Sequence, residues 1–232
     1  MKRGFITNEF YHISNIGVDK RKIYLQNDDY SRFVRGLYDF NDAKPALEFS
    51  RRFNLKKSES DKNVGYQKPY VNLYGFSLMP NHYHLLLEQV QNKGISAYMR
   101  KINIGHTNAF NKKHKRKGYL FEGPFKSKYV KDDIRLGFMI CYIHSKPLDL
   151  WKPNWNEKGL DNKEIEQALR FLEKYKWSSH LEYLGKKQKL SVINKDFLLE
   201  FFDGTKGYKE FFIDWLKNHK KNIKHIENYI IE

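Results

Sequence analysis

The stretch that decides the fold lies at residues 70–89 and reads YVNLYGFSLMPNHYHLLLEQ. Both halves are rich in aromatic and apolar residues, which favour β-strands over residues 70–78 and 82–89. Pro80 and Asn81 stand between them, and this pair is a turn signal. The sequence therefore predicts a β-hairpin. Strict alternation would place every second residue of its first strand on one face: Tyr70, Asn72, Tyr74, Phe76 and Leu78.

Segments on either side of the hairpin extend it into a larger sheet. Residues 10–16 (FYHISNI) read as a strand, and residues 119–130 (YLFEGPFKSKYV) as an edge or bulged strand because they contain Pro124. Apolar spacing and capping residues predict helices over residues 29–40, 95–111 and 132–145, and the polar residues 56–63 predict a loop. This alternation of strands and helices predicts an α+β fold with a mostly antiparallel sheet.

Composition changes near Pro153, after which the chain reads as helical. We therefore predict two domains, residues 1–150 and a helical C-terminal extension of residues 151–232. The extension has two apolar helix stripes, and we interpret the second as packing against the first domain. The stripes consist of Ile165, Ala168, Leu169 and Leu172, and of Tyr208, Phe211, Phe212, Trp215 and Leu216.

Charge narrows the class of partner. The 232 residues include 43 Lys and Arg against 27 Asp and Glu, a net charge of +16, which indicates a polyanion such as nucleic acid. The single cysteine, Cys141, excludes an internal disulfide and fits a reducing cytoplasm. We expect no signal peptide and no membrane span, because no apolar run is long enough.

The second hairpin strand contains a pair of histidines, His82 and His84. Residues two apart in a strand point to the same face, so both imidazoles can approach one cation while Tyr83 and Leu85 enter the core. Two protein ligands leave coordination positions open for a phosphate oxygen and water, as a catalytic ion requires. Only neutral imidazole ligates a metal, so activity is expected to fall below about pH 6. His12 and His144 could assist DNA contacts, but we interpret them as structural.

The segment MPNHYHLLLE at residues 79–88 resembles the HUH motif of single-tyrosine transposases of the IS200-like and REP-associated type. Four further stretches resemble that family in order and spacing: YHISNIGVDKRKIY, GYLFEGPFKSKYV, CYIHSKPLDL and KYKWSSHLEYLG. The resemblance implies a ferredoxin-like antiparallel sheet with helices on one face. It also implies a homodimer, a Mg²⁺ or Mn²⁺ ion, and single-stranded DNA with a hairpin or palindromic repeat as the partner. A 5′-phosphotyrosine intermediate keeps the energy of the broken bond, so no nucleotide cofactor is expected.

By this resemblance the tyrosine nucleophile is Tyr142, five residues before Pro147. Three other tyrosines stay open as rivals: Tyr119, Tyr129 and Tyr175. Many relatives have Asn or Gln four residues after the nucleophile, where this chain has Lys146, and an ammonium has no lone pair for a metal. The lysine could instead bind the phosphate. Relatives often have arginine where this chain has Pro124.

The sequence also indicates where DNA binds. Cations beside aromatic residues at a strand edge can follow phosphates and stack unpaired bases. The predicted DNA-binding residues are Lys112, Lys113, Lys115, Arg116, Lys117, Lys126 and Lys146. Two alternatives remain at this point: a catalytically inactive DNA-hairpin-binding protein, which Lys146 favours, and an RNA-binding protein with an open RRM-like sheet, which leaves the histidine pair unexplained.

Overall fold

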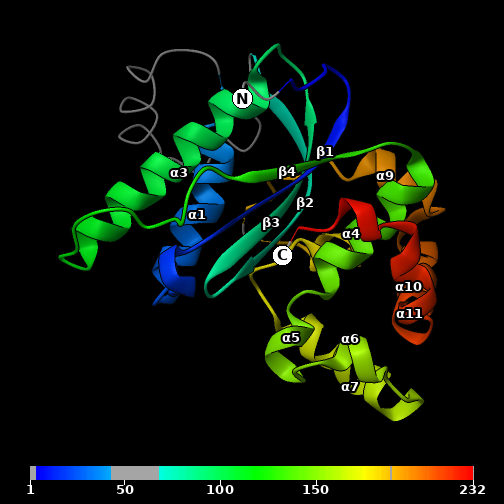
Figure 1. The fold of residues 1–232 in the computed structure, drawn as a ribbon. Helices are drawn as coiled ribbons and strands as arrows, with labels where there is room; N and C mark the ends of the chain where they lie inside the picture. Colours follow the sequence, from blue (N-terminus) through cyan, green and yellow to red (C-terminus); the bar gives the residue numbers. More distant parts are fainter. Residues whose placement is uncertain (1–3, 43–67, 189, 232) are drawn as a thin grey trace.

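The structure is a computed structural model that describes residues 4–42, 68–188 and 190–231 (Figure 1). The predicted loop at residues 56–63 lies outside the described residues. The four strands are β1 (Phe10–Ile16), β2 (Val71–Met79), β3 (His82–Gln89) and β4 (Lys126–Val130). They form one sheet in the order β2-β3-β1-β4, and every neighbouring pair is antiparallel. This confirms the predicted α+β fold, with the strand order of a ferredoxin-like sheet, and it places β4 at an edge.

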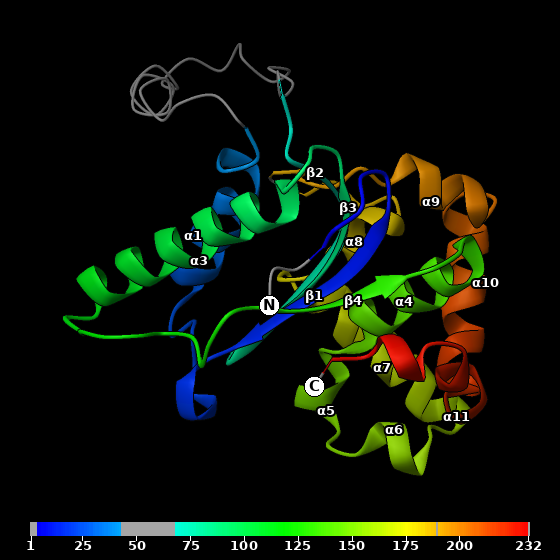
Figure 2. The ribbon, with the colours of Figure 1, turned by 45° about the horizontal axis from the view of Figure 1, so that its top comes forward.

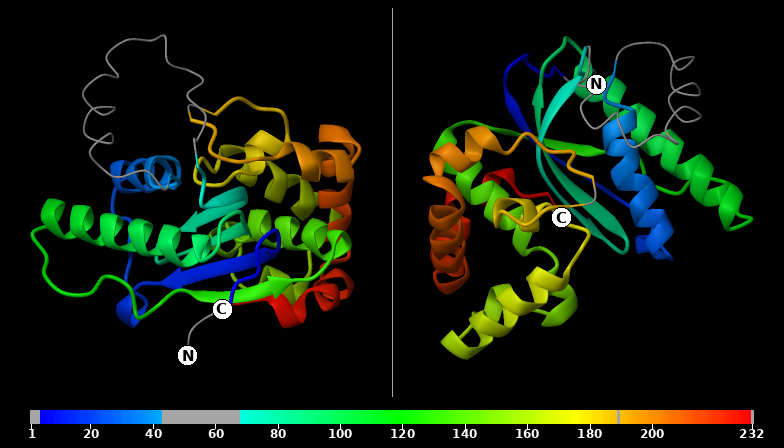
Figure 3. Two further views of the ribbon diagram at one scale, coloured as in Figure 1. Left: turned by 90° about the horizontal axis from the view of Figure 1, so that it is seen from above. Right: turned by 180° about the vertical axis from the view of Figure 1, so that it is seen from behind.

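One face of the sheet is covered by α1 (Asn27–Asp39) and α3 (Gly94–Lys113), as Figures 1 and 3 show. Apolar residues of α3 are buried there, together with strand residues such as Ile13, Leu85 and Leu87. We call this side of the sheet the α1/α3 face.

The opposite face is also covered. Here α4 (Asp133–Ser145) lies against β2 and β3, and the helices of the C-terminal extension pack around it (Figure 2). These are α5 (Leu148–Trp151), α6 (Trp155–Lys158), α7 (Asn162–Lys174), α8 (His180–Tyr183), α9 (Asp196–Phe201), α10 (Gly204–Lys217) and α11 (His219–Asn222). Three short 3₁₀ turns complete the described chain: η1 (Val18–Lys20), η2 (Ile223–His225) and η3 (Glu227–Tyr229).

A single hydrophobic cluster joins the extension to the sheet. Trp215 and Phe212 of α10 belong to the same buried cluster as Ile140 of α4 and Leu86 of β3. The aromatic stripe of α10 therefore packs against the first part of the chain, as its sequence predicts. In the part of the chain that the structure describes, helices cover most of both sheet faces, which leaves no broad open face for RNA in the manner of an RRM.

The prediction that Tyr70, Asn72, Tyr74, Phe76 and Leu78 share one face is wrong. The register of β2 against β3 shifts between Leu73 and Gly75, which leaves Tyr74 as the extra residue of a β-bulge. Tyr74 consequently joins the cluster around α4, whereas Phe76 and Leu78 join the core on the α1/α3 face. Its hydroxyl donates to Glu88 Oε2 at 2.7 Å, which gives the displaced ring a polar partner.

None of the helices that the structure describes has the length and apolar character needed to cross a bilayer.

Candidate metal and nucleophile site

The histidine pair lies on the sheet face that α4 covers, which we call the histidine face. Tyr83 and Leu85 are fully buried in the core on the other face, as predicted from alternation. In the register of the sheet, His84 stands opposite Ser14 of β1 and Ser77 of β2. All three side chains are buried on the histidine face. The imidazoles of His82 and His84 have centroids 5.0 Å apart.

His84 makes a hydrogen bond to a third histidine. Its Nδ1 lies 2.9 Å from Nε2 of His12 on β1, and Nδ1 of His12 lies 2.8 Å from the backbone oxygen of Tyr229. Nε2 of His84 is buried and has no hydrogen-bond partner. A metal-ligating imidazole presents such a nitrogen before it binds its ion. Single ring nitrogens of His106, His180 and His219 are also buried without a hydrogen-bond partner, so the position of His84 beside His82 distinguishes it.

His82 is held in a comparable way by the hairpin turn. Its Nδ1 lies 2.7 Å from Oδ1 of Asn81, and an amide oxygen only accepts, so Nδ1 is the protonated nitrogen and Nε2 keeps its lone pair. The ring of His82 is only partly buried. The two Nε2 atoms thus fit a divalent metal as a pair of neutral nitrogen ligands.

Burial keeps both imidazoles neutral. It lowers the pKa of His82 to about 4 and holds the pKa of His84 well below its ordinary value. The nearby ammonium of Lys146 lowers both further. The pH below which protonation competes with ligation is therefore lower than the value near pH 6 that ordinary histidines would give.

Tyr142 lies directly beside this pair. Its ring, only 4% exposed, meets the rings of His12 and His84 edge-on, each at a centroid distance of 5.8 Å. The close approach of α4 to the sheet depends on Gly75, where an added Cβ would come within 2.1 Å of Cδ1 of Ile140. The bulge in β2 and a glycine thus allow the helix to bring its tyrosine to the histidines.

The three rival tyrosines point elsewhere. Tyr119 is 87% exposed, in the segment between α3 and β4. The hydroxyl of Tyr129 donates to Glu9 at 2.9 Å, and that of Tyr175 to the backbone oxygen of Leu78 at 2.6 Å. Of these four candidates, Tyr142 is the one with recorded ring contacts to the histidine pair.

Lys146 follows Tyr142 by one helical turn. Its Nζ lies 2.8 Å from Oδ2 of Asp149 and 5.5 Å from the centroid of the Tyr142 ring. The side chain is 14% exposed. Over the described residues, no three His, Cys, Asp or Glu side chains form a group that could hold a metal ion. Among the described residues the site therefore offers two histidine nitrogens to a metal ion, and the nearby side chain of Lys146 is a cation.

The basic loop, which we define as residues 112–117, projects from the end of α3, away from α4 (Figures 1 and 3). Two of its predicted DNA-binding cations have internal partners. Lys113 binds Asp29 at 3.0 Å, and Arg116 donates to the backbone oxygen of Tyr119 at 2.6 Å. The other three cations of the loop, Lys112, Lys115 and Lys117, are exposed.

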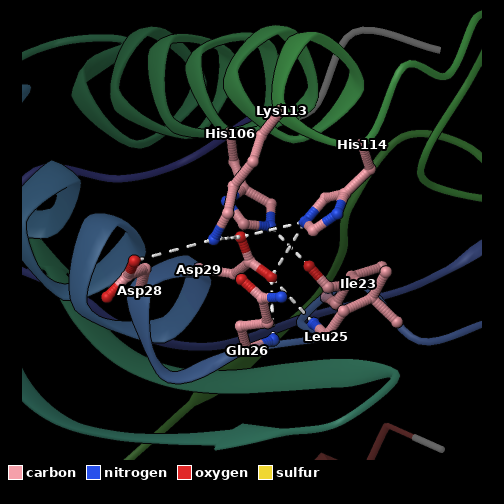
Figure 4. A network of polar contacts seen from close by, with 8 residues as sticks. All are labelled: Ile23, Leu25, Gln26, Asp28, Asp29, His106, Lys113 and His114. Carbon is pink, nitrogen blue, oxygen red and sulfur yellow. Dashed lines mark hydrogen bonds and ion pairs between the residues drawn. The ribbon is translucent and has the colours of Figure 1, made fainter.

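Figure 4 shows the network that anchors this loop. The carboxylate of Asp29 accepts from the amides of Leu25 and Gln26 as well as from Lys113 and His114. Burial by itself would raise the pKa of Asp29, but these donors outweigh it and lower the pKa to about 2. The network fixes the start of α1 against the end of α3.

Two lysines of β4 lie closer to the histidines. Lys126 and Lys128 stand opposite Ser14 and His12 in the register, so their side chains are on the histidine face, and both are exposed. Lys126 was predicted to bind DNA, whereas Lys128 was missed. Residues directly opposite each other in an antiparallel pair share a face, so Lys128 could have been assigned to the face of His12 if the register of β1 against β4 had been known.

His144 is structural, as predicted: its two ring nitrogens lie 2.7 Å from the hydroxyls of Tyr208 and Ser179. His12 was also interpreted as structural. It contacts the histidine pair through its hydrogen bond to His84.

Comparisons with known proteins agree with the motif. Residues 55–146 match the family model "Transposase IS200 like". No curated protein sequence matches the chain. Among solved structures, a REP-associated tyrosine transposase bound to a REP hairpin gives a TM-score of 0.43 at 12% identity, over 65% of this chain and 73% of that one. The matched segment includes the histidine hairpin, α3, β4 and the helix of Tyr142. Residues 55–146 are therefore similar in sequence to the IS200-like transposase family.

Proposed function

We propose that this chain cleaves and rejoins single-stranded DNA, with Tyr142 as the nucleophile and a divalent ion held by His82 and His84. One observation carries the proposal: the Tyr142 ring lies edge-on to His84, whose buried Nε2 has no hydrogen-bond partner. A nucleophile and a metal ligand from two different elements thus meet at one point.

The reaction is a phosphoryl transfer. Oη of Tyr142 attacks the scissile phosphorus, the bond to the 3′ oxygen breaks, and the phenolic proton leaves while the departing 3′ oxygen gains one. The product is a 5′-phosphotyrosine and a free 3′-OH. A second 3′-OH later attacks the phosphotyrosine, which releases the phenol and reseals the strand without an external energy source.

A phenol with a pKa near 10 is a weak nucleophile at neutral pH, so the site has to stabilise charge on the phosphate. A Mg²⁺ or Mn²⁺ ion bound to the two Nε2 atoms would supply a Lewis acid for a phosphate oxygen. Lys146, close to the ring of Tyr142, would hold the same phosphate through its ammonium. The lysine thus takes over charge neutralisation at the place where relatives have an amide.

The proposed substrate is DNA with a hairpin or palindromic repeat. The exposed lysines of the basic loop would contact the phosphates of the hairpin stem, and Lys126 and Lys128 would guide the strand toward the histidine face. A homodimer is proposed from the family resemblance, and light scattering of the purified chain tests it.

The test uses a labelled hairpin DNA with a single-stranded flank, incubated with the protein and Mn²⁺ and resolved on a denaturing gel. The wild-type chain is expected to form a covalent protein–DNA adduct. Tyr142→Phe should abolish the adduct and retain DNA binding, while Tyr175→Phe, a control at a rival tyrosine, should still form it. An adduct that persists in Tyr142→Phe contradicts the assignment of the nucleophile.

A second candidate function is that of a hairpin-binding protein that no longer cuts. The observation that favours it is the combination of Lys146 near the metal-ligand pair with a Tyr142 ring that is only 4% exposed. Tight hairpin binding with no adduct in Mg²⁺ or Mn²⁺ would establish this function and overturn the first.

A further inference from the structure

The histidine face has a continuous line of polar contacts that the cleavage reaction itself does not explain. It runs from the backbone oxygen of Tyr229 to Nδ1 of His12 at 2.8 Å, and from Nε2 of His12 to Nδ1 of His84 at 2.9 Å. We call these three residues the histidine relay. We propose that the relay makes His12 a positioning residue, which fixes His84 in the tautomer that presents Nε2 to the metal. The inference rests on the proposed function for the role of the metal.

The direction of each hydrogen bond follows from its ends. A backbone oxygen only accepts, so Nδ1 of His12 donates to Tyr229. A neutral imidazole has one protonated nitrogen, which leaves Nε2 of His12 as an acceptor. Nδ1 of His84 must then donate to it, and Nε2 of His84 retains its lone pair. The carbonyl of Tyr229 thereby determines the tautomer of a ring it does not touch.

Both rings stay neutral because both are buried. Burial lowers the pKa of His12 to about 4, even though the hydrogen bond to Tyr229 raises it, and the pKa of His84 lies well below its ordinary value. Both nitrogens of a charged imidazole donate. A charged His84 would have no lone pair on Nε2, and a charged His12 would offer no acceptor to Nδ1 of His84.

The relay also gives the C-terminal extension a part in the site. Tyr229 belongs to η3, which lies against β4. Its ring lies under the guanidinium of Arg135, at 5.7 Å. Ile226, just before it, is fully buried in the cluster around α4. The end of the extension is thus packed in place, and the carbonyl it presents to His12 has a fixed position.

Other buried histidines show that this arrangement is particular to the relay. His106, on the α1/α3 face, also meets a backbone oxygen, with Nε2 at 2.8 Å from Ile23, but its second nitrogen leads to no other histidine. His106 is 4% exposed, against 0% for His12 and 1% for His84. It is therefore the matched control for substitution of His12.

The first experiment measures the tautomers directly in the metal-free protein. Long-range ¹H–¹⁵N spectra of ¹⁵N-histidine-labelled protein, assigned with single-histidine variants, distinguish protonated from bare ring nitrogens. The relay predicts a protonated Nδ1 and a bare Nε2 for both His12 and His84. A proton on Nε2 of His84, or a charged ring, in the wild-type protein overturns the inference.

The second experiment removes the relay and measures Mn²⁺ affinity by calorimetry. His12→Phe keeps the ring shape without an acceptor and should weaken Mn²⁺ binding by roughly 10–100-fold, the usual cost of losing a partner behind a metal-ligating histidine. His12→Gln, which restores an acceptor oxygen, should recover most of the affinity. A chain that ends at Asn228 should lose affinity as His12→Phe does, and the control His106→Phe should not.

The outcomes separate this inference from the proposed function. If the tautomers and Mn²⁺ affinities are as predicted but no covalent DNA adduct forms, the relay is supported and the proposed cleavage activity is contradicted. Circular dichroism verifies that His12→Phe is folded. If this folded variant has the Mn²⁺ affinity of the wild type and an unchanged His84 spectrum, the relay is overturned. If His12→Phe does not fold, the Mn²⁺ affinity of the chain that ends at Asn228 and the wild-type histidine spectrum test the relay instead.

Discussion

At the residue scale, the site differs from a complete metal centre by one side chain. Lys146 places a positive charge beside two neutral histidines, and its own partner Asp149 offsets that charge only in part. A cation near a metal site lowers metal affinity, because the ammonium repels the ion and supplies no lone pair. Under the proposed function, the lysine would therefore lower metal affinity and supply a direct contact to phosphate.

This exchange predicts the effect of Lys146→Gln, which removes the charge and adds a carbonyl oxygen. We expect Mn²⁺ to bind at least about tenfold more tightly, a gain of roughly 1.4 kcal/mol. Calorimetric titration of the metal-free protein measures it. Lys152→Gln is the matched control, since Lys152 pairs with Glu164 on a different helix. Equal affinity of wild type and Lys146→Gln would show that the lysine does not stand at a ligand position.

Single residues also show what the sequence made predictable. The pair His82 and His84 could be found because a spacing of two in a strand fixes a common face. Tyr142 needed the family resemblance, since a helix flank of apolar residues reads equally well as core. The relay could not be found, because Tyr229 and His12 are separated by 217 positions and meet only through a backbone oxygen.

At the element scale, the contact between α4 and β2 decides whether Tyr142 reaches the histidines. Gly75→Ala would put a Cβ within 2.1 Å of Cδ1 of Ile140, so we expect a loss of about 1–3 kcal/mol in unfolding free energy from overpacking. Ile140→Val removes Cδ1 and should cost about 0.5–1.5 kcal/mol alone. Denaturant titration measures all variants.

The double variant Gly75→Ala, Ile140→Val is the control for this contact. Because the second change removes the atom that the first would strike, the double variant should be more stable than the sum of the two single losses predicts. Simple additivity would show that α4 does not approach β2 at this point.

The bulge that allows this approach shows where prediction of elements failed. Alternation along residues 70–78 gives no sign of an extra residue, because Tyr74, like Phe76, is a large aromatic residue that suits either face of a strand. The choice is made by tertiary contacts, namely the bond from the Tyr74 hydroxyl to Glu88 and the space beside α4. Helix stripes and most strand positions, by contrast, follow from local periodicity and were predicted. The exception is the strand predicted over residues 119–130, of which only Lys126–Val130 forms β4.

The Asp29 network joins α1 to α3 and predicts a pH dependence of stability. The pKa of Asp29 is lowered to about 2 in the folded chain, against about 3.9 for an unfolded aspartate. Its contribution is therefore fully present above pH 4 or so and is lost as the pH falls through about 2. Unfolding free energy measured against pH should decline less steeply over this range in Asp29→Asn than in wild type. Parallel pH profiles would contradict the network.

At the scale of the whole molecule, charge and fold indicate which cations would face the proposed DNA partner. The net charge of +16 predicted a polyanion, but not which cations face it. The structure uses Lys113 and Arg116 internally and leaves Lys112, Lys115 and Lys117 exposed on the basic loop. The sequence alone could not separate the internally bonded cations from the others. The partner of Lys113 is Asp29 on α1, and that of Arg116 is the backbone oxygen of Tyr119.

The exposed lysines predict a salt effect. Changing Lys112, Lys115 and Lys117 together to Gln should weaken hairpin binding and reduce the slope of log affinity against log salt by about 2–3, since each phosphate contact contributes roughly 0.9. Fluorescence anisotropy with a labelled hairpin measures it. The same change of Lys217, Lys220 and Lys221, exposed on the C-terminal helices, removes equal charge and should alter the slope little. Equal effects of the two sets would mean that net charge alone drives binding.

The central claim is that Tyr142 forms the covalent link to DNA, and peptide mapping tests it most directly. The protein is incubated with hairpin DNA and Mn²⁺, digested with protease and nuclease, and its peptides are sequenced by mass spectrometry. We predict a nucleotide 5′-phosphate on the peptide of α4, attached at Tyr142. A nucleotide attached at Tyr119, Tyr129 or Tyr175, or DNA that is cut without any protein-bound nucleotide, would contradict it.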